Sequence, residues 1–239
     1  MKHLSKHIFY LQLIVLLLLL VACNFDTIVG EGNVIKQKRE IQVFDKVFVQ
    51  GAFEIVLKSA PNNMLEVEAD SNLLQTITTI VKDSVLDIST KKTILKSQKL
   101  KIFIYAPNIN QIKISGAVEL LSDSILGYRH LLVDVSGAAR VDLNINTSKF
   151  ETNVSGGAEI FLNGNSSSFA AILTGAGRIN AFDFHTDTSI ITLSGIGIVN
   201  VKTNKLLDVT ISGAGKVVFK GDAQVVKNIT GAGKVEKAY

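Results

Sequence analysis

A short motif recurs through the second half of this 239-residue chain and constrains its fold more than any other feature. Each copy reads Ser or Thr, Gly, two mostly small residues, one variable residue and an aliphatic residue. Seven clear copies contain Gly116, Gly137, Gly156, Gly175, Gly195, Gly213 and Gly231, and Gly51 belongs to an eighth, divergent copy. The clear copies are 18 to 21 residues apart. A unit this short cannot bury an apolar face alone, so the repeat predicts backbone rungs stacked into a solenoid.

Aliphatic residues alternate with other residues on both sides of each glycine. Val135 and Val154 stand two residues before a glycine, and Val141 and Ile160 stand four residues after one. A period of two is typical of strands that bury one face, so each copy predicts two strands joined by a tight corner. Glycine suits the corner either because φ is positive or because neighbouring rungs approach closely. The sequence therefore predicts an all-β, β-helix-like solenoid of about eight rungs of 18–21 residues.

Stacked rungs place equivalent positions in columns along the solenoid. The variable column reads Glu119, Arg140, Glu159 and Arg178 over four successive copies. Opposite charges would then lie side by side, which predicts ion pairs of about 0.2–1 kcal/mol each. The Ser/Thr column before the glycines predicts, in the same way, a ladder of hydroxyl groups.

The two ends of the repeat region differ from its middle. In the last copy two inward positions become Lys227 and Lys237, which we interpret as an end-cap that disfavours further stacking. Residues 58–107 break the period and predict an irregular β part that caps the first rungs. Within it, we expect a short helix from Asp70 to Thr76 with Asp70 as its N-cap.

The N-terminus has the features of an exported lipoprotein. Lys2 and Lys6 precede an apolar stretch from Ile8 to Val21, which is short for a membrane span and typical of a signal peptide. The stretch ends in Leu20-Val21-Ala22-Cys23, which resembles the bacterial lipobox. That resemblance implies cleavage before Cys23 and anchoring to membrane lipid through its acylated sulfur. The alternative is an uncleaved anchor or an ordinary signal peptide with a chance cysteine.

These features divide the chain into three parts. Residues 1–22 form the signal peptide, 23–31 the anchor and short linker, and 32–239 the solenoid domain. Within the domain, 58–107 is the irregular part and 108–239 holds the regular repeats. Asn24 follows the cysteine where an aspartate would resemble an inner-membrane retention signal, so we expect the outer membrane, on either face.

The net charge of +4 does not indicate a nucleic-acid binder. Lys2 and Lys6 lie in the segment that we expect to be removed, and nucleic-acid binding requires a clustered basic face. The chain has one local basic run, formed by Lys91, Lys92, Lys96, Lys99 and Lys101. We interpret this run as a solvated face, with a polyanion site as the alternative.

No motif predicts catalysis, a metal site or a cofactor. Gly-x-Gly pairs such as Gly175 and Gly177 precede no helix, so they are turns rather than phosphate loops. His130 and His185 fall in different copies, whereas zinc needs three or four converging ligands. A general acid/base pair needs two carboxyl groups within roughly 5–10 Å. No two of the candidate carboxylates share an outward column on adjacent rungs: Asp134, Asp142, Glu159, Asp183, Asp187 and Asp208.

The repeated Ser-Gly-Ala-Gly-x-Val motif resembles the bacterial family called "putative auto-transporter adhesin, head GIN domain". The blocks Gly32-Asn33-Val34, Phe44-Asp45-Lys46-Val47 and 67–74 resemble its opening blocks, so the similarity covers roughly residues 30–237. The resemblance implies a β-helix-like fold and a cell-envelope location, commonly as a lipoprotein. It implies no ligand and no catalytic residue.

Three functions follow from these observations. The first is a non-enzymatic adhesin or scaffold that presents the solenoid surface to a glycan or an envelope protein. The second is a polysaccharide-active enzyme, which an acidic cluster in one groove would favour, whereas flat faces of Ser, Thr and Asn would favour the binder. The third is an envelope signalling accessory. The sequence does not indicate an oligomeric state.

Overall fold

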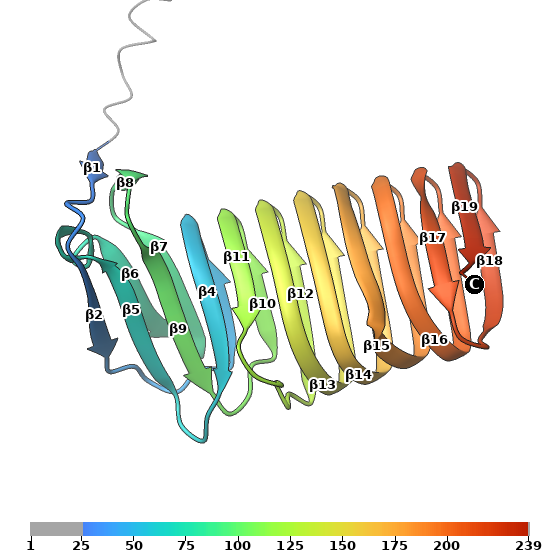
Figure 1. The fold of residues 1–239 in the computed structure, drawn as a ribbon, viewed down its shortest axis with the longest axis horizontal. Coiled ribbons are helices and arrows are strands. Elements are labelled where there is room, and N and C mark those ends of the chain that lie inside the picture. The colour runs from blue at the N-terminus through green and yellow to red at the C-terminus, as the bar shows by residue number, and fades with distance from the viewer. Residues whose placement is uncertain (1–25, 239) are drawn as a thin grey trace, which may run out of the picture.

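The structure is a computed structural model that describes residues 26–238. They form an elongated β-solenoid of about seven turns, with the N-terminal part at one end and the last rung at the other (Figure 1). The predicted all-β solenoid is confirmed. The regular part consists of β3 (Lys46–Val49), β4 (Ala52–Ser59), β10 (Gln111–Ile114), β11 (Ala117–Ser122), β12 (His130–Val135), β13 (Ala138–Val154), β14 (Gly157–Leu173), β15 (Ala176–Leu193), β16 (Ile196–Ile211), β17 (Ala214–Lys220), β18 (Gln224–Ile229) and β19 (Ala232–Lys237).

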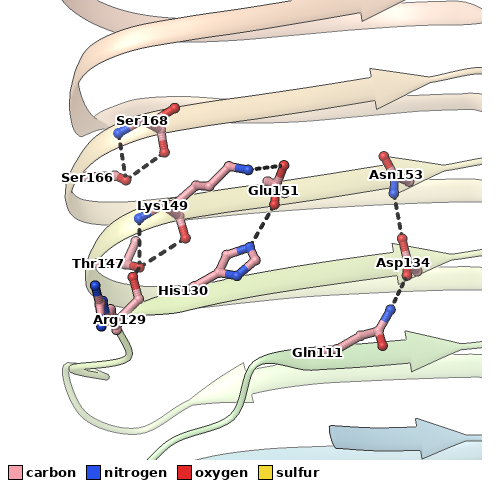
Figure 2. Close-up of polar contacts among 10 residues, drawn as sticks. All are labelled: Gln111, Arg129, His130, Asp134, Thr147, Lys149, Glu151, Asn153, Ser166 and Ser168. Carbon is pink, nitrogen blue, oxygen red and sulfur yellow. Dashed lines mark hydrogen bonds and ion pairs between the residues drawn. The ribbon is translucent and has the colours of Figure 1, made fainter.

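Each rung has two faces that meet at the repeat glycine. The pre-glycine face consists of the strand residues just before each glycine, and the post-glycine face of those just after it. β13 to β16 each run from one glycine corner to the next through a far bend, which Figure 2 shows around Thr147 and Ser166. Neighbouring rungs of the regular part pair in parallel, so equivalent residues of successive copies lie beside one another.

The core is formed by the aliphatic columns of both faces. On the pre-glycine face the register joins Val135 to Val154 and Val154 to Leu173. On the post-glycine face it joins Val141 to Ile160. All five side chains are buried. The alternation of aliphatic residues therefore predicted which side chains point inward.

The repeat glycines lie where successive rungs are closest. A Cβ placed on Gly175 would come within 3.0 Å of the carbonyl oxygens of Gly156 and Ser155. The backbone ladder also continues through the corner, where Ala176 N donates to Gly156 O over 3.0 Å. Among the repeat glycines only Gly51 has a positive φ, of 119°. Close approach, rather than a left-handed backbone, is thus what requires glycine in the seven clear copies.

The predicted ladder of Ser/Thr hydroxyl groups beside these glycines does not form in the part of the chain that the structure describes. Hydroxyl groups of this column donate to the backbone instead. Ser136 Oγ donates to Ile114 O over 3.1 Å, and Thr174 Oγ1 donates to Val154 O over 3.2 Å. Each acceptor is a main-chain carbonyl of the preceding rung. A carbonyl is within reach because the corner brings the two backbones together, so the hydroxyl column adds side-chain-to-backbone bonds between rungs.

The N-terminal end is closed by an irregular cap. Its elements are β1 (Thr27–Val29), β2 (Val34–Arg39), β5 (Met64–Asp70), a 3₁₀ helix (Ser71–Leu73), β6 (Ile77–Lys82), β7 (Val85–Thr90), β8 (Thr93–Lys96) and β9 (Leu100–Ala106). β2, β5 and β9 pair antiparallel on one side, and β6 pairs antiparallel with β7 on the other. No helix among residues 26–238 is long and apolar enough to cross a membrane.

Asp70 is the predicted N-cap of a short helix, and for its side chain this prediction is wrong. The helix spans only Ser71–Leu73, and the Asp70 carboxylate makes no capping bond to it. Instead the buried carboxylate accepts hydrogen bonds from Gly32 N (2.6 Å) and Gln98 N (2.9 Å). Burial raises the pKa of Asp70, but the hydrogen bonds from these backbone N–H groups outweigh burial, so the pKa lies below its usual value. Asp70 therefore joins the chain before β2 to the loop after β8.

The C-terminal end is open and carries the two predicted lysines. Lys227 pairs in register with Val209, and Lys237 pairs with Phe219, so each lysine continues a column that is buried in the preceding rung. Both lysine side chains are nevertheless exposed. Ile229 is 37% exposed on this last rung, because no further rung covers it. Lys237 Nζ lies 3.3 Å from an Asp222 carboxylate oxygen. Charge thus lies where another rung would otherwise stack.

The far bend contains packing that the repeat did not indicate. Phe150 and Phe169 are paired in register, but the next residue of that column is Ser189. Phe184 fills the space from a bulge in β15, with ring centroids 5.9 Å from both phenylalanines. Ser189 instead bonds the buried hydroxyl of Thr203 over 2.7 Å. Because β15 bulges, the aromatic side chain of this rung comes from Phe184 and not from position 189, and the core stays filled.

Candidate binding surfaces of the solenoid

The pre-glycine face carries a polar ladder across three rungs. Gln111 Nε2 donates to Asp134 Oδ2 over 2.9 Å, and Asn153 Nδ2 donates to Asp134 Oδ1 over 2.7 Å (Figure 2). Asp134 therefore faces amides, not a second carboxylate, on both adjacent rungs, and it lies in register with Lys113, two residues after Gln111, and with Asn153. Both carboxylate oxygens accept from amides, so this side chain is held in place as an acceptor rather than paired with a second acid.

A second polar group lies beside that ladder, nearer the far bend. His130 Nε2 lies 2.7 Å from Glu151 Oε2, and Lys149 Nζ lies 2.8 Å from Glu151 Oε1 (Figure 2). Burial raises the pKa of Glu151, but the bonds to Lys149 and His130 outweigh burial and lower the pKa overall. The carboxylate stays ionised between two donors, which suits hydrogen bonding and disfavours proton donation.

Further along the same face one outward column is uncharged, while Asp208 lies in the column beside it, in register with Ile190. The outward column beyond Asn153 continues through Ile172, Thr192, Thr210 and Asn228. Ile190, beside it, is also exposed. Strand backbones hold these side chains in a regular array with the spacing between paired strands, about 4.8 Å. Such an array can contact an extended partner with hydroxyl, amide and aliphatic groups.

The post-glycine face carries the predicted column of charges. Arg140 lies between Glu119 and Glu159, with nitrogen–oxygen distances of 3.6 and 3.0 Å. Its guanidinium also lies 4.6 Å from the ring centroid of Phe161. Arg178 pairs in register with Glu159 but makes no ion pair within 4.0 Å among the described residues. The expected alternation of charges thus gives ion pairs around Arg140 only.

A shallow groove follows the small residues beside that column. Its larger section has a volume of about 600 Å³ and is floored by Ala176, Gly177, Gly197 and Gly215. Ile196 is exposed at its side. The groove exists because the glycine corners leave no side chains to fill it.

The far bend holds a separate polar cleft of about 390 Å³. Asn165 Nδ2 donates to Asn146 Oδ1 over 3.0 Å, and His185 Nε2 lies 3.3 Å from Lys202 Nζ. The two histidines therefore lie in different settings on different rungs. Residues 26–238 contain no group of three or more His, Cys, Asp or Glu side chains that could hold a metal ion.

The predicted basic run does not form one surface. Lys101 Nζ contacts Glu54 at 2.5 Å, and Lys99 Nζ lies 3.8 Å from the same carboxylate. Lys92 pairs with Asp26 at 3.1 Å. Lys91 and Lys96 are exposed and make no ion pair within the described part of the chain. Two lysines of the run are thus half-buried partners of Glu54, which the sequence alone did not indicate.

Not every predicted site residue can be placed. The lipobox Leu20, Val21, Ala22 and Cys23 lies outside the described residues, so its expected cleavage and acylation stay predictions. Gly51, Gly116, Gly137, Gly156, Gly175, Gly195, Gly213 and Gly231 all lie at the corners between the two faces. The polar groups on the pre-glycine face were missed as a set, because their partners come from different rungs.

Comparisons with known proteins agree with this architecture. A family model described as "Putative auto-transporter adhesin, head GIN domain" matches residues 43–223. No curated protein matches the chain in sequence.

Solved structures of similar fold include proteins from Bacteroides and Parabacteroides. A protein described as a putative adhesin from Bacteroides fragilis has a TM-score of 0.77 and 19% identity, over 88% of this chain and 100% of that one. A putative adhesin from Parabacteroides distasonis has a TM-score of 0.71 and 21% identity, over 89% and 100%. A protein from the same species, described as a putative lipid binding protein, has a TM-score of 0.62 and 20% identity, over 89% and 100%.

Proposed function

The chain belongs to the putative auto-transporter adhesin, head GIN domain family, and from that premise we propose that it is a cell-envelope lipoprotein whose solenoid binds a glycan or protein partner without catalysis. Family membership supports an adhesin-like role at the cell envelope. The anchor, the partner and the absence of catalysis are our proposals.

One observation carries the proposal of a binder. The pre-glycine face is a regular array whose outward groups include Asn153, Thr192 and Thr210, and on which the acidic side chains Asp134 and Glu151 are already bonded. Asp134 accepts from two amides and Glu151 is held between a lysine and a histidine. A glycosidase mechanism needs one carboxyl group poised to donate a proton and a second within reach. The array instead offers hydrogen-bond donors and acceptors at regular spacing, which suits recognition of an extended partner.

The binding role predicts loss of binding when the pre-glycine face is changed. The double variant Asn153→Lys/Thr192→Lys places two long cations on that array, and we expect it to abolish binding to a glycan array or to isolated envelope proteins. The matched control, Asn200→Lys/Ile196→Lys, places two cations on the post-glycine face, where Ile196 is exposed, and should bind as the native protein does. Unaltered circular dichroism must accompany both variants. Equal binding by all three proteins would contradict the assignment, and release of product from a polysaccharide would favour an enzyme.

Lipid anchoring predicts two results in the producing bacterium. Cys23→Ser removes the sulfur that would carry the diacylglyceryl group, so we expect the protein to leave the membrane fraction. Globomycin, which inhibits lipoprotein signal peptidase, should leave a larger, uncut precursor. Native-like retention of the serine variant, or a band of unchanged size after treatment, would remove the lipobox assignment and leave an ordinary leader.

A further inference from the structure

The chain enters the solenoid through a small ribbon at its N-terminal end. β1 pairs in parallel with β8, joining Thr27 to Thr93 and Ile28 to Ile94 (Figure 1). Main-chain bonds close both ends of the ribbon, from Thr93 N to Asp26 O over 2.9 Å and from Gly30 N to Lys96 O over 2.8 Å. The first described residues are therefore fixed to the body of the solenoid.

The distance from this ribbon to the proposed anchor is short. Only Asn24 and Phe25 separate Cys23 from Asp26. Three peptide steps span at most about 11 Å between Cα atoms, even when fully extended. A bilayer that holds the acyl chains of Cys23 must therefore lie within roughly that distance of Asp26, the residue just before β1.

The ribbon exposes the side chains that suit such a surface. The register skips Leu95, since Ile28 pairs with Ile94 and Val29 with Lys96, and Leu95 is left 65% exposed. Val29 is 51% exposed on the neighbouring strand. Aliphatic side chains at a tip, with cations around them, are typical of segments that enter the head-group region of a membrane.

The charges around the two aliphatic side chains are mainly positive. Lys91 and Lys96 are exposed and make no ion pair within residues 26–238. Lys92 is paired with Asp26, and Glu31 accepts a hydrogen bond from Ser71. Two unpaired lysines thus remain for lipid phosphates, and anionic lipids attract such basic segments.

A hollow beside the ribbon opens next to these groups. It has a volume of about 470 Å³, and its lining combines Lys96 and the Gly51 corner with aliphatic and small polar side chains: Ile94, Leu95, Leu100, Thr90, Thr93 and Ser97. Aliphatic side chains beside a lysine and hydroxyl groups fit the upper part of a lipid acyl chain and its phosphate. The hollow therefore provides room for lipid at the position that the short tether dictates.

We propose that the β1–β8 ribbon is a membrane-contact surface that seats the N-terminal end of the solenoid on an anionic lipid bilayer. The inference rests on the proposed lipid anchor, which brings the bilayer to the ribbon. Acyl chains alone fix the distance of a protein from the membrane. The ribbon adds a second contact, so it fixes the orientation and leaves both faces accessible.

The test uses the full-length lipoprotein in vesicles of phosphatidylethanolamine and phosphatidylglycerol. Acylated Cys23 has no free thiol, so Thr93→Cys places a single polarity-sensitive fluorophore on β8 without altering Leu95. Ile190→Cys places the same fluorophore on the pre-glycine face as a matched control. We expect a blue-shifted emission and quenching by head-group spin-labelled lipid at position 93, and a water-like emission at position 190. Adding Leu95→Glu or Lys91→Glu/Lys96→Glu to Thr93→Cys should return the emission to the water-like value.

The outcomes separate this inference from the proposed anchor. A protein that floats with the vesicles while both probes read water would overturn the membrane-contact surface alone. A protein that does not float with the vesicles would overturn the anchor, and the inference with it. Quenching at position 93 that survives both charge and leucine substitutions would overturn the assignment of Leu95 and the lysines as the contact.

Discussion

Replacing Val154 by aspartate is expected to unfold the middle of the solenoid. Val154 is 1% exposed and pairs with Val135 and Leu173 in the buried column of the pre-glycine face. The new carboxylate would have no cation or donor within this aliphatic column, and an uncompensated buried charge costs about 3–5 kcal/mol. Stability in a solenoid is close to a sum over neighbouring rungs, so the loss interrupts the stack on both sides. Thermal unfolding followed by circular dichroism measures the effect.

Thr192→Asp is the matched control for this substitution. Thr192 lies on the same face in an outward column, where an added carboxylate stays in water. Its melting temperature should remain close to the native value, since outward substitutions usually change stability by less than about 0.5 kcal/mol. Equal melting of Val154→Asp and the control would mean that the aliphatic column does not form the core.

Replacing Gly175 by alanine is expected to destabilise the protein strongly, although it adds only one methyl group. Its Cβ would come within 3.0 Å of two carbonyl oxygens of the preceding rung, those of Gly156 and Ser155. Both are backbone atoms in a hydrogen-bonded corner, so neither can move without breaking the ladder. Overpacking of this kind costs about 1–3 kcal/mol or more. Urea unfolding at a fixed temperature gives the change in free energy.

The preceding corner provides the opposite result for the same chemical change. At Gly157 a Cβ would meet nothing nearer than Ala176 O at 3.9 Å, and its φ is not positive. The equivalent residues of the adjacent rungs are already Ala138 and Ala176. Gly157→Ala should therefore leave stability unchanged or raise it by up to about 1 kcal/mol, because alanine restricts the unfolded chain. Similar losses from both substitutions would show that rung spacing does not select the corner residue.

The regular part of the fold could be predicted because its partners recur at fixed spacing. Val154 and Ile160 follow from the period of two, and the pairing of Arg140 with Glu119 and Glu159 follows from aligning copies. Nothing in the spacing required Arg178 to repeat that contact, and it does not. Alignment fixes which residues are neighbours, whereas side-chain rotamers decide which of them touch.

The contacts within the cap and the far bend could not be predicted, since the partners in these contacts are distant in sequence or out of register. The Asp70 carboxylate accepts hydrogen bonds from the backbone N–H groups of Gly32 and Gln98. Every residue except proline has such a group, so the residue types do not indicate these partners. Phe184 replaces the aromatic side chain missing at Ser189 because β15 bulges, which the average repeat length conceals. The contacts on the binding surfaces could not be predicted either, because the partner of each outward side chain comes from the adjacent rung.

The stacking of rungs has a consequence for the evolution of chain length. Each regular rung contacts its neighbours through the same columns, so gain or loss of one whole repeat leaves the remaining contacts unchanged. Such a change alters the height of the molecule by one strand spacing, about 4.8 Å, and moves only the terminal lysine-bearing rung. Duplication within the gene can thus adjust how far the distal end extends, while the lateral chemistry of the existing rungs is preserved.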